Sequence, residues 1–532
     1  MRYFAMLAAA VALPLAAQDH QHGGDDPTRL GRVDFPISCP AIQAPFERAM
    51  ALLHSFWWDE AARAFGELTT QAPECGMAWW GLALTHWNNP FAGGPSGTAL
   101  AAGAAAAEQA ARVDAPTVRE QHYIVAVNAL YRDHATTPNA QRLQAYSERM
   151  GITLNHAPDD TEAAIYYALS LVATASPTDT TFARQRQAHA ILEPLFLARP
   201  DHPGLAHYVI HANDSPRLAA QGLRAARAYA DIAPSVPHAQ HMPSHIFIRL
   251  GLWQENIDAN RRSYEAGASY ARAERWEGLG GHEFHAMDYM VYGYLQLGQD
   301  SAARYWTDYA LSVTDVHPGR ALISEYPRAV MPARLALERD RWADAAQVPI
   351  VTTTPVAQFI SLFSRGMGAA RGGDAAGARS ALSAFEAMQA TLDREPYWSR
   401  VAGIKHQALR AWILLIEGDT TQALAEARLA AMVEDVTEKH PVTPGEVLPA
   451  RELYGDMLLA TGRYAEARAA YEAALTREPG RARSIYGAAR ASEMAGDRAV
   501  ALEWYGRYLQ LMEHADGTRA EIAAARRAVG SR

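Results

Sequence analysis

Residues 458–475 read LLATGRYAEARAAYEAAL and residues 492–509 read SEMAGDRAVALEWYGRYL, and the two stretches match at an offset of 34 positions. In both, a glycine in a short polar turn separates two helical segments, so Gly462 corresponds to Gly496. Further along, small and aromatic residues recur at the same offset in the pairs Ala467 with Ala501 and Tyr471 with Tyr505. A single helix–turn–helix unit leaves an apolar face uncovered, so successive units are expected to stack on one another.

A 34-residue period with small residues at the helix crossing and an aromatic residue late in the second helix is typical of the tetratricopeptide repeat. Looser copies of the turn and second helix occur at 52–68, 249–260, 296–306, 337–346, 370–382 and 416–427. Apolar residues at spacings of three and four dominate, and alternating Val/Ile/Thr runs are nearly missing. We therefore predict an all-α fold, a tetratricopeptide-type α-solenoid of stacked helix–turn–helix repeats.

The N-terminus predicts export. Met1 and Arg2 are followed by an apolar run from residue 3 to 15 and by Ala16-Ala17, which indicates a signal peptide over residues 1–17. A buried N-terminal helix is the alternative. We expect a flexible segment with His, Gly and Asp at 18–35, irregular repeats with a histidine cluster (202–290) at 36–435, and regular repeats at 436–532. The mature protein would be periplasmic or secreted.

The amino-acid composition limits the classes of binding partner that are expected. The formal net charge of −9 argues against nucleic acid or an anionic membrane. No later stretch reaches 18 uninterrupted apolar residues, so no membrane span is expected. The chain has two cysteines, Cys39 and Cys75, which favour a disulfide in an exported protein. Two buried free thiols are the alternative.

Histidines are concentrated in one part of the chain. Residues 202–285 hold eight of the 20, where even spreading would put about three. They occur in the stretches HPGLAHYVIH, PHAQHMPSH and GHEFHAMD, and are His202, His207, His211, His238, His241, His245, His282 and His285. Spacings of three, four and seven place imidazoles on one helix face, and neutral imidazole is the commonest metal ligand.

The repeat frame brings these histidines to one level. His238 lies 13 residues before the turn glycine Gly251, and His285 lies 13 before the next turn glycine, Gly298. Equivalent offsets in adjacent repeats place side chains side by side on the first helices, which line the concave groove of the array. If Asp214 takes the preceding turn position, then His207 and His211 face the same patch. Three consecutive repeats would thus contribute ligands.

The cluster therefore predicts a divalent transition-metal site in the groove, with copper or zinc favoured and iron or nickel compatible with the same donors. We expect the ligands to be His207, His211, His238, His241, His245 and His285, with His282, Asp214, Glu283 and Asp288 as secondary candidates. His202 precedes Pro203 and is expected to cap a helix. No HExxH motif is present, so the pattern indicates binding and leaves catalysis open. The alternative is a scaffold that binds a peptide, protein or small molecule, in which the histidines are polar lining.

Three blocks carry a resemblance. HPGLAHYVIHANDSPRL with PHAQHMPSHIFIRLGLWQENIDAN, the upstream LLHSFWWDEAARAF, and the downstream PGEVLPARELYGDMLLATGRYAEARAAYEAAL resemble a family of exported bacterial tetratricopeptide-repeat proteins. The similarity covers nearly the whole chain beyond residue 35. It implies the repeat fold and export, and it supplies no activity.

Overall fold

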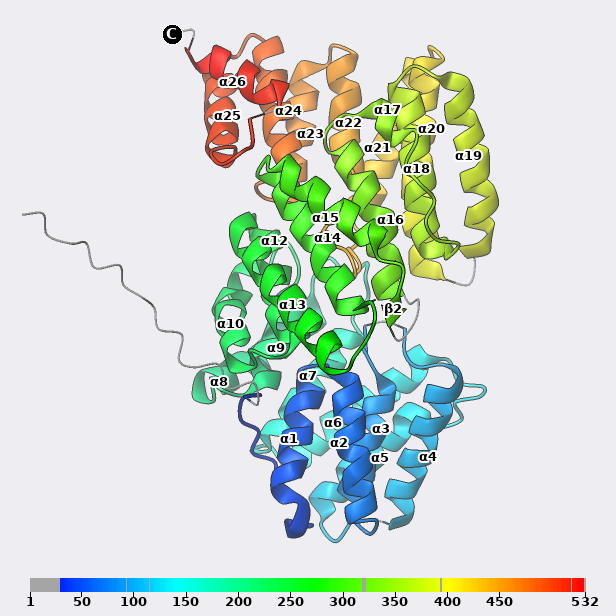
Figure 1. Ribbon diagram of the computed structural model, residues 1–532, viewed down its shortest axis with the longest axis vertical. Coiled ribbons are helices and arrows are strands. Elements are labelled where there is room, and N and C mark those ends of the chain that lie inside the picture. Colours follow the sequence, from blue (N-terminus) through cyan, green and yellow to red (C-terminus); the bar gives the residue numbers. More distant parts are fainter. Residues whose placement is uncertain are drawn as a thin grey trace, which may run out of the picture.

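The computed structural model describes residues 29–530 except 92, 114, 318–321, 393–394 and 518. The expected signal peptide (1–17) and most of the segment expected to be flexible (18–35) lie outside these residues. The described chain is mostly helical, which confirms the all-α prediction (Figure 1). Its two strands, β1 (Leu279–Gly280) and β2 (Val316–His317), form one short parallel pair.

The first half of the chain forms one end and the middle of an elongated molecule (Figure 1). After a short 3-10 turn, η1 (Pro40–Ile42), its helices are α1 (Gln43–His54), α2 (Trp58–Gln71), α3 (Gly76–Trp87), α4 (Gly97–Val113), α5 (Val118–Tyr131), α6 (Asn139–His156), α7 (Thr161–Ala173), α8 (Ala183–Ala198), α9 (Pro203–Asn213), α10 (Ala219–Ile232), α11 (Pro237–His241), α12 (Pro243–Leu250), α13 (Trp253–Ala273), α14 (Gly281–Gln296) and α15 (Asp300–Ser312).

The second half forms the other end. Its elements are α16 (Leu322–Leu337), α17 (Trp342–Ala345), α18 (Pro355–Arg371), α19 (Ala375–Gln389), η2 (Ala390–Leu392), α20 (Pro396–Ile416), α21 (Thr420–Asp435), α22 (Ala450–Ala460), α23 (Tyr464–Arg477), α24 (Ala482–Met494), α25 (Arg498–Leu511) and α26 (Ala520–Gly530). No helix among the described residues is both long and apolar enough to cross a membrane.

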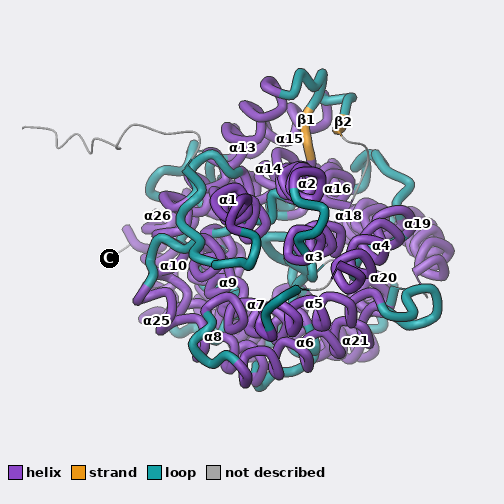
Figure 2. The backbone as a smooth tube through the Cα atoms, turned by 90° about the horizontal axis from the view of Figure 1, so that it is seen from below, coloured by secondary structure: helices purple, strands orange, loops and turns teal. Residues whose placement is uncertain are grey.

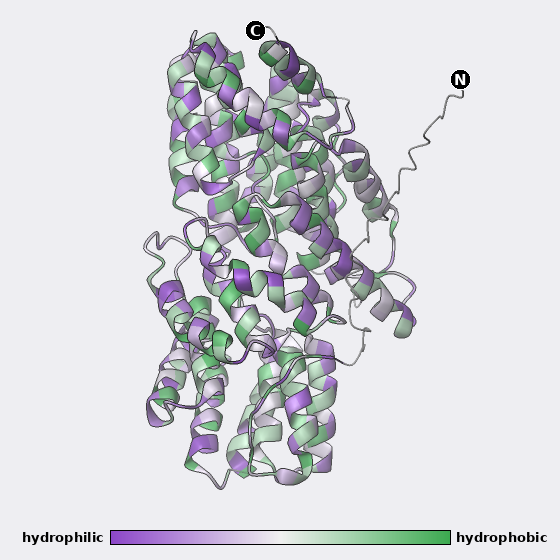
Figure 3. Cartoon of the chain, turned by 90° about the vertical axis from the view of Figure 1, so that its left-hand side faces the viewer, coloured by the Kyte–Doolittle hydropathy of each residue, from purple (hydrophilic) through white to green (hydrophobic). Residues whose placement is uncertain are grey.

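Consecutive helices pack against each other, and first helices also contact one another. The second set of contacts links α14, α16, α18, α20, α22 and α24 in turn into an inner layer. Seen along the long axis, the helices surround the centre of the molecule (Figure 2). Most of them carry both hydrophilic and hydrophobic residues (Figure 3), as expected for helices with one covered face.

The repeated glycines and the repeated aromatic residue have the structural roles that the sequence predicts. Gly462 and Gly496 both adopt a positive φ, +79° and +82°, at the turn between paired helices. The Tyr471 ring packs between neighbouring first helices, because a Cβ on Gly455 would lie 2.9 Å from it and one on Gly487 would lie 2.5 Å from it. Glycine at these positions lets the aromatic side chain of one repeat reach two first helices.

The C-terminal repeats return to the middle of the molecule. Trp253 Nε1 donates to the Gly480 carbonyl at 3.0 Å, and Arg519 pairs with Asp300 at 2.6 Å. The loop between α21 and α22, residues 436–449, also crosses to the central helices, where the Tyr289 hydroxyl donates to the Pro441 carbonyl at 3.0 Å. The inner face of the array is therefore covered at its centre.

The N-terminal segment needs one correction. Residues 29–35, expected to belong to a flexible stretch, are packed against the helices, and Leu30, Val33 and Phe35 are buried. Phe35 is fully buried and contacts Phe46 and Trp80 edge to face. Burying the Phe35 ring is favourable in free energy, and this gain offsets the entropic cost of ordering the segment.

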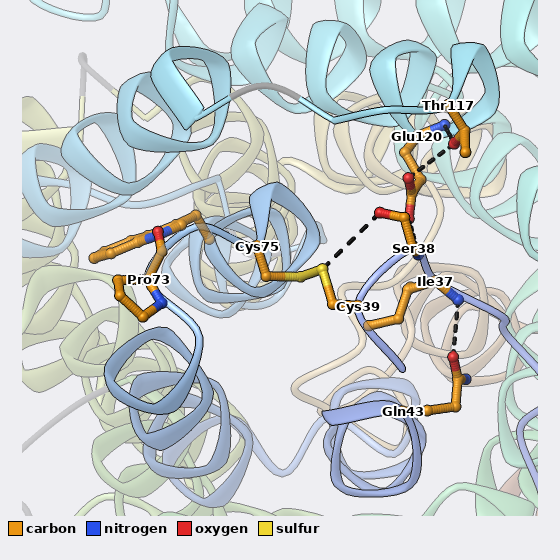
Figure 4. The surroundings of a disulfide bond; sticks show 9 residues. Ile37, Ser38, Cys39, Gln43, Pro73, Cys75, Thr117 and Glu120 are labelled. Carbon is orange, nitrogen blue, oxygen red and sulfur yellow. Dashed lines mark hydrogen bonds between the residues drawn. A yellow bond between two sulfur atoms is a disulfide. The ribbon is translucent and has the colours of Figure 1, made fainter. Parts of the chain in front are cut away.

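The predicted disulfide is confirmed. Cys39 and Cys75 are bonded, with their Cα atoms 6.1 Å apart (Figure 4). Beside it, Ser38 N–H donates to Glu120 Oε1 at 2.7 Å and Ile37 N–H donates to Gln43 Oε1 at 2.9 Å (Figure 4). The bond and these hydrogen bonds hold the segment before α1 against α3 and α5.

Replacing both cysteines by serine should lower the free energy of unfolding by about 3–4 kcal/mol, because the bond joins residues separated by 36 positions. Guanidinium denaturation followed by circular dichroism measures the loss. Dithiothreitol should weaken the wild type to the same extent and leave the variant unchanged. Equal stability of variant and oxidised wild type would show that packing alone holds the segment.

Candidate metal centre

Three histidines from two helices form what we call the first triad: His207 and His211 on α9, and His238 on α11. His207 Nε2 lies 3.0 Å from His211 Nε2 and 3.1 Å from His238 Nε2. On its other side, His207 Nδ1–H donates to the backbone carbonyl of His54 at 2.6 Å. A carbonyl oxygen only accepts, so the His207 proton is on Nδ1 and the Nε2 lone pair faces the other two rings.

Phe56 encloses the first triad. It lies in the turn between α1 and α2, and its ring centre is 4.4 Å from that of His207, 5.4 Å from His238 and 5.8 Å from His211. Its backbone has a φ of +53°, a strained conformation for a bulky side chain. Phe91 adds a second ring, 4.4 Å from His211. The triad therefore has an aromatic wall.

The second triad consists of His241 on α11, His245 on α12 and His285 on α14. A helix break at Met242 separates the first two, because α12 begins at Pro243, which has no N–H to continue α11. The break still leaves His241 Nε2 and His245 Nε2 facing each other at 3.0 Å. The His285 ring centre is 4.3 Å from that of His241, and its Nδ1 is buried without a hydrogen-bond partner among the described residues.

Both facing nitrogens of the second triad are lone-pair donors. His241 Nδ1–H donates to Asn260 Oδ1 at 2.6 Å, and Asn260 is fixed in that orientation because its Nδ2 donates to the Asn256 carbonyl. His245 Nδ1–H donates to Asp214 Oδ2 at 2.8 Å. Each neutral ring thus has its only proton on Nδ1. Two lone pairs 3.0 Å apart repel unless a cation lies between them.

Asp214 lies at the C-terminal end of α9 and is shared by several groups. Besides His245, it contacts Arg249 Nε at 2.9 Å and Lys439 Nζ at 3.5 Å. Burial acts to raise the pKa of Asp214, but Lys439 and Arg249 hold it well below its usual value. Lys439 belongs to the loop 436–449, and burial lowers its pKa to about 8. The loop thereby brings a titratable amine next to Asp214, the acid that orients His245.

A third group, His54, Glu162 and His202, is built differently. His54 Nε2–H and His202 Nε2–H donate to the two oxygens of Glu162 at 2.9 and 2.8 Å. The remaining nitrogens accept, from the Tyr208 hydroxyl at 3.2 Å and from Leu205 N–H at 3.3 Å. Burial opposes the charge of Glu162, yet the two histidines hold its pKa far below the usual range. Every polar atom has a partner, so this group is a closed hydrogen-bond network.

Burial keeps the imidazoles of the two triads neutral. It is the largest cause of the lowered pKa of all six, and it brings that of His207 to about 3. Neighbouring histidines lower most of these values further, while Asp214 partly restores that of His245. Neutral imidazole is the form that binds metal.

The structure divides the six predicted ligands between two sites. His238 and His285, which share a repeat position, are in different triads, because His238 faces His207 on α9 while His285 on α14 packs against His241. His202 caps α9, as expected, and also joins the closed network.

The secondary candidates have separate surroundings. Asp214 orients His245. The half-buried His282 has its ring centre 6.0 Å from that of His238. Glu283 is buried with Oε1 unpartnered among the described residues. Asp288 pairs with Arg334 at 3.3 Å, and burial raises its pKa to about 6.

Several residues that surround or orient the triads were not predicted from the sequence. Asn260 and Lys439 have no regular spacing from the histidines they serve, so no sequence pattern could identify them. Phe56 belongs to the aromatic stretch HSFWWDE at 54–60, where packing is the ordinary expectation. Its positive φ is the feature that distinguishes it, and the sequence does not display it.

No family model and no curated protein matches the chain. Among solved structures, it is similar to yeast Tom70, with 11% identity, 92% of this chain and 96% of that one covered, and a TM-score of 0.34. The human IFIT1 dimer gives 13% identity, coverages of 78% and 86%, and a TM-score of 0.36. The tetratricopeptide-repeat domain of P58(IPK) gives 13%, 78% and 99%, and 0.21. The repeat arrangement itself is seen in the packing of the chain's own helices.

The metal-free protein should lose stability between pH 7.5 and 5.5. The pKa of each triad histidine is lowered from 6.5, so below that pH the unfolded chain binds protons that the folded chain does not. The loss should be roughly 1 kcal/mol for each histidine that stays neutral. Thermal melts at the two pH values measure it, and replacing His241 by Ala should reduce the difference. Equal melting temperatures would contradict the buried, neutral triads.

Proposed function

We propose that this protein is an exported tetratricopeptide-repeat protein that binds a divalent transition metal, copper or zinc, through its buried histidine cluster. The observation that carries the proposal is the pair His241 Nε2 and His245 Nε2, whose lone pairs face each other at 3.0 Å. Protonation of either ring would also bring a cation there, but burial disfavours the imidazolium. A metal ion relieves the same repulsion without protonating either ring.

The distances fit ligands of one ion. Two nitrogens bound at 2.0–2.1 Å with an angle of 90–110° between them lie about 2.8–3.4 Å apart. The Nε2–Nε2 distances of 3.0 and 3.1 Å fall in that range. The outer nitrogens donate to Asn260, Asp214 and a backbone carbonyl, which is the usual support of metal-bound histidine.

The scaffold alternative predicts histidines satisfied by their neighbours. The group of His54, Glu162 and His202 meets that description completely, and the second triad does not, because its two facing nitrogens both carry lone pairs and His285 Nδ1 has no partner among the described residues. A cavity of about 300 Å³ between the C-terminal repeats offers a site for a peptide or small molecule. Within it Arg483 pairs with both Asp340 and Asp456, so these charges are already matched.

Export is supported by the disulfide, since such bonds persist in oxidising compartments. In the periplasm or outside the cell, copper and zinc are the divalent ions that an all-imidazole site would encounter and retain.

Purified wild-type protein should retain copper or zinc after desalting, and the variant His241→Ala/His245→Ala should lose the ion of the second triad. Inductively coupled plasma mass spectrometry measures the content. The matched control is His156→Ala, because His156 is exposed at the end of α6. Metal at background level in wild-type protein reloaded with either ion would overturn the proposal.

Replacing Asp214 by Asn should weaken metal binding about 10- to 100-fold, because the amide is a poorer acceptor for His245 Nδ1–H and lowers the basicity of Nε2. Competition with a chromophoric chelator gives the affinity. Unchanged affinity in a variant that keeps the wild-type circular dichroism would show that Asp214 serves Arg249 and Lys439 alone.

A further inference from the structure

We infer that the two triads hold a pair of copper ions, one in each triad, close enough to share a small bridging ligand. This inference rests on the proposed metal binding and adds the number, the identity and the mutual arrangement of the ions.

The first triad offers three ligand atoms of its own. The His207 Nε2 lone pair faces two further Nε2 atoms within 3.1 Å, and its orientation is set by the His54 carbonyl rather than by anything in the second triad. It repeats the design of the second triad: two histidines at i and i+4 along one segment, with a third from a neighbouring helix. All three ligands are again neutral imidazoles.

The two triads adjoin. The ring centres of His211 and His245 are 6.2 Å apart, and so are those of His238 and His241, which lie three residues apart on α11. A metal bound at Nε2 lies about 3 Å from the centre of its own ring. An ion in one triad would therefore lie close to the imidazole ligands of the other triad, as in a paired metal centre.

Charge selects copper over zinc. Neither triad contains a carboxylate, and Asp214, the nearest acid, is already shared by Arg249 and Lys439. Two divalent ions would bring four positive charges into a buried region where the carboxylate of Asp214 is already neutralised by Arg249 and Lys439, which is costly. Copper can enter as Cu(I) with half that charge, whereas zinc has only its divalent state. The Cu(II) pair would need a shared anion such as hydroxide.

The enclosure limits that shared ligand to a small one. Phe56 and Phe91 pack on the rings of the first triad, and Tyr289 lies 4.6 Å from the ring of His241 in the second. The Tyr289 hydroxyl is held by the loop 436–449 and is 3.5 Å from His245 Nε2. Such a site has room for a hydroxide ion or a diatomic molecule. A peptide is too large for it.

The test begins with metal-stripped, full-length protein loaded anaerobically with Cu(I) and desalted. Mass spectrometry should find two copper ions per chain. Oxidation with ferricyanide removes one electron from each Cu(I), and the electron paramagnetic resonance signal should then integrate to far less than one spin per copper, because the two spins couple through the shared ligand. Competition with zinc should leave the copper in place.

Variants separate the two sites. Both His238→Ala in the first triad and His285→Ala in the second should retain one copper that gives close to one spin per copper. His211→Gln provides a milder replacement in the first triad, and His156→Ala, which should keep two coupled ions, is the matched control.

Wild-type protein binding no metal of either kind would overturn the proposed function as well. One copper per chain, or two with full signal, would overturn the pair and leave the proposed function standing. Displacement of both ions by zinc would overturn the assignment to copper.

Discussion

The centre of this protein is organised by one constraint: His241 and His245 each have their only proton on Nδ1, so their Nε2 lone pairs meet at 3.0 Å inside the fold. Neither nitrogen can turn away, because Asn260 and Asp214 hold the opposite side of each ring. Both side chains lie on one side of the chain despite the break between α11 and α12. Burial then disfavours the proton that would otherwise relieve the repulsion.

The repeats supply what such a site needs, which is rigid support from several helices. α9, α11, α12 and α14 bring the six imidazoles together, and α13 contributes Asn260. The return of the C-terminal repeats places the loop 436–449 over the second triad, while Phe56 covers the first. The closed network around Glu162 shows by contrast how buried histidines are arranged when they serve structure: all of its nitrogens have hydrogen-bond partners.

Features that depend on local residue spacing could be predicted from the sequence, and features that depend on contacts between distant segments could not. The glycines at 462 and 496 and the tyrosine at 471 report contacts within and between adjacent repeats, so their spacing predicts the fold. The pairs at i and i+4 predict which imidazoles meet along one segment of the chain, His207 with His211 and His241 with His245. The split into two triads could not be predicted, because it depends on the helix break at Met242 and on how α14 packs beside α11. Lys439 was equally hidden, since it comes from a loop more than 150 residues away from the second triad.

The most direct test of the central claim is anomalous diffraction from crystals of the copper-loaded protein, with data collected on both sides of the copper absorption edge. The account predicts an anomalous peak within about 2.0–2.1 Å of His241 Nε2 and His245 Nε2, with their Nδ1 atoms still bonded to Asn260 and Asp214. A fully loaded crystal that shows no peak at either triad, or that shows copper only on surface histidines, would contradict it.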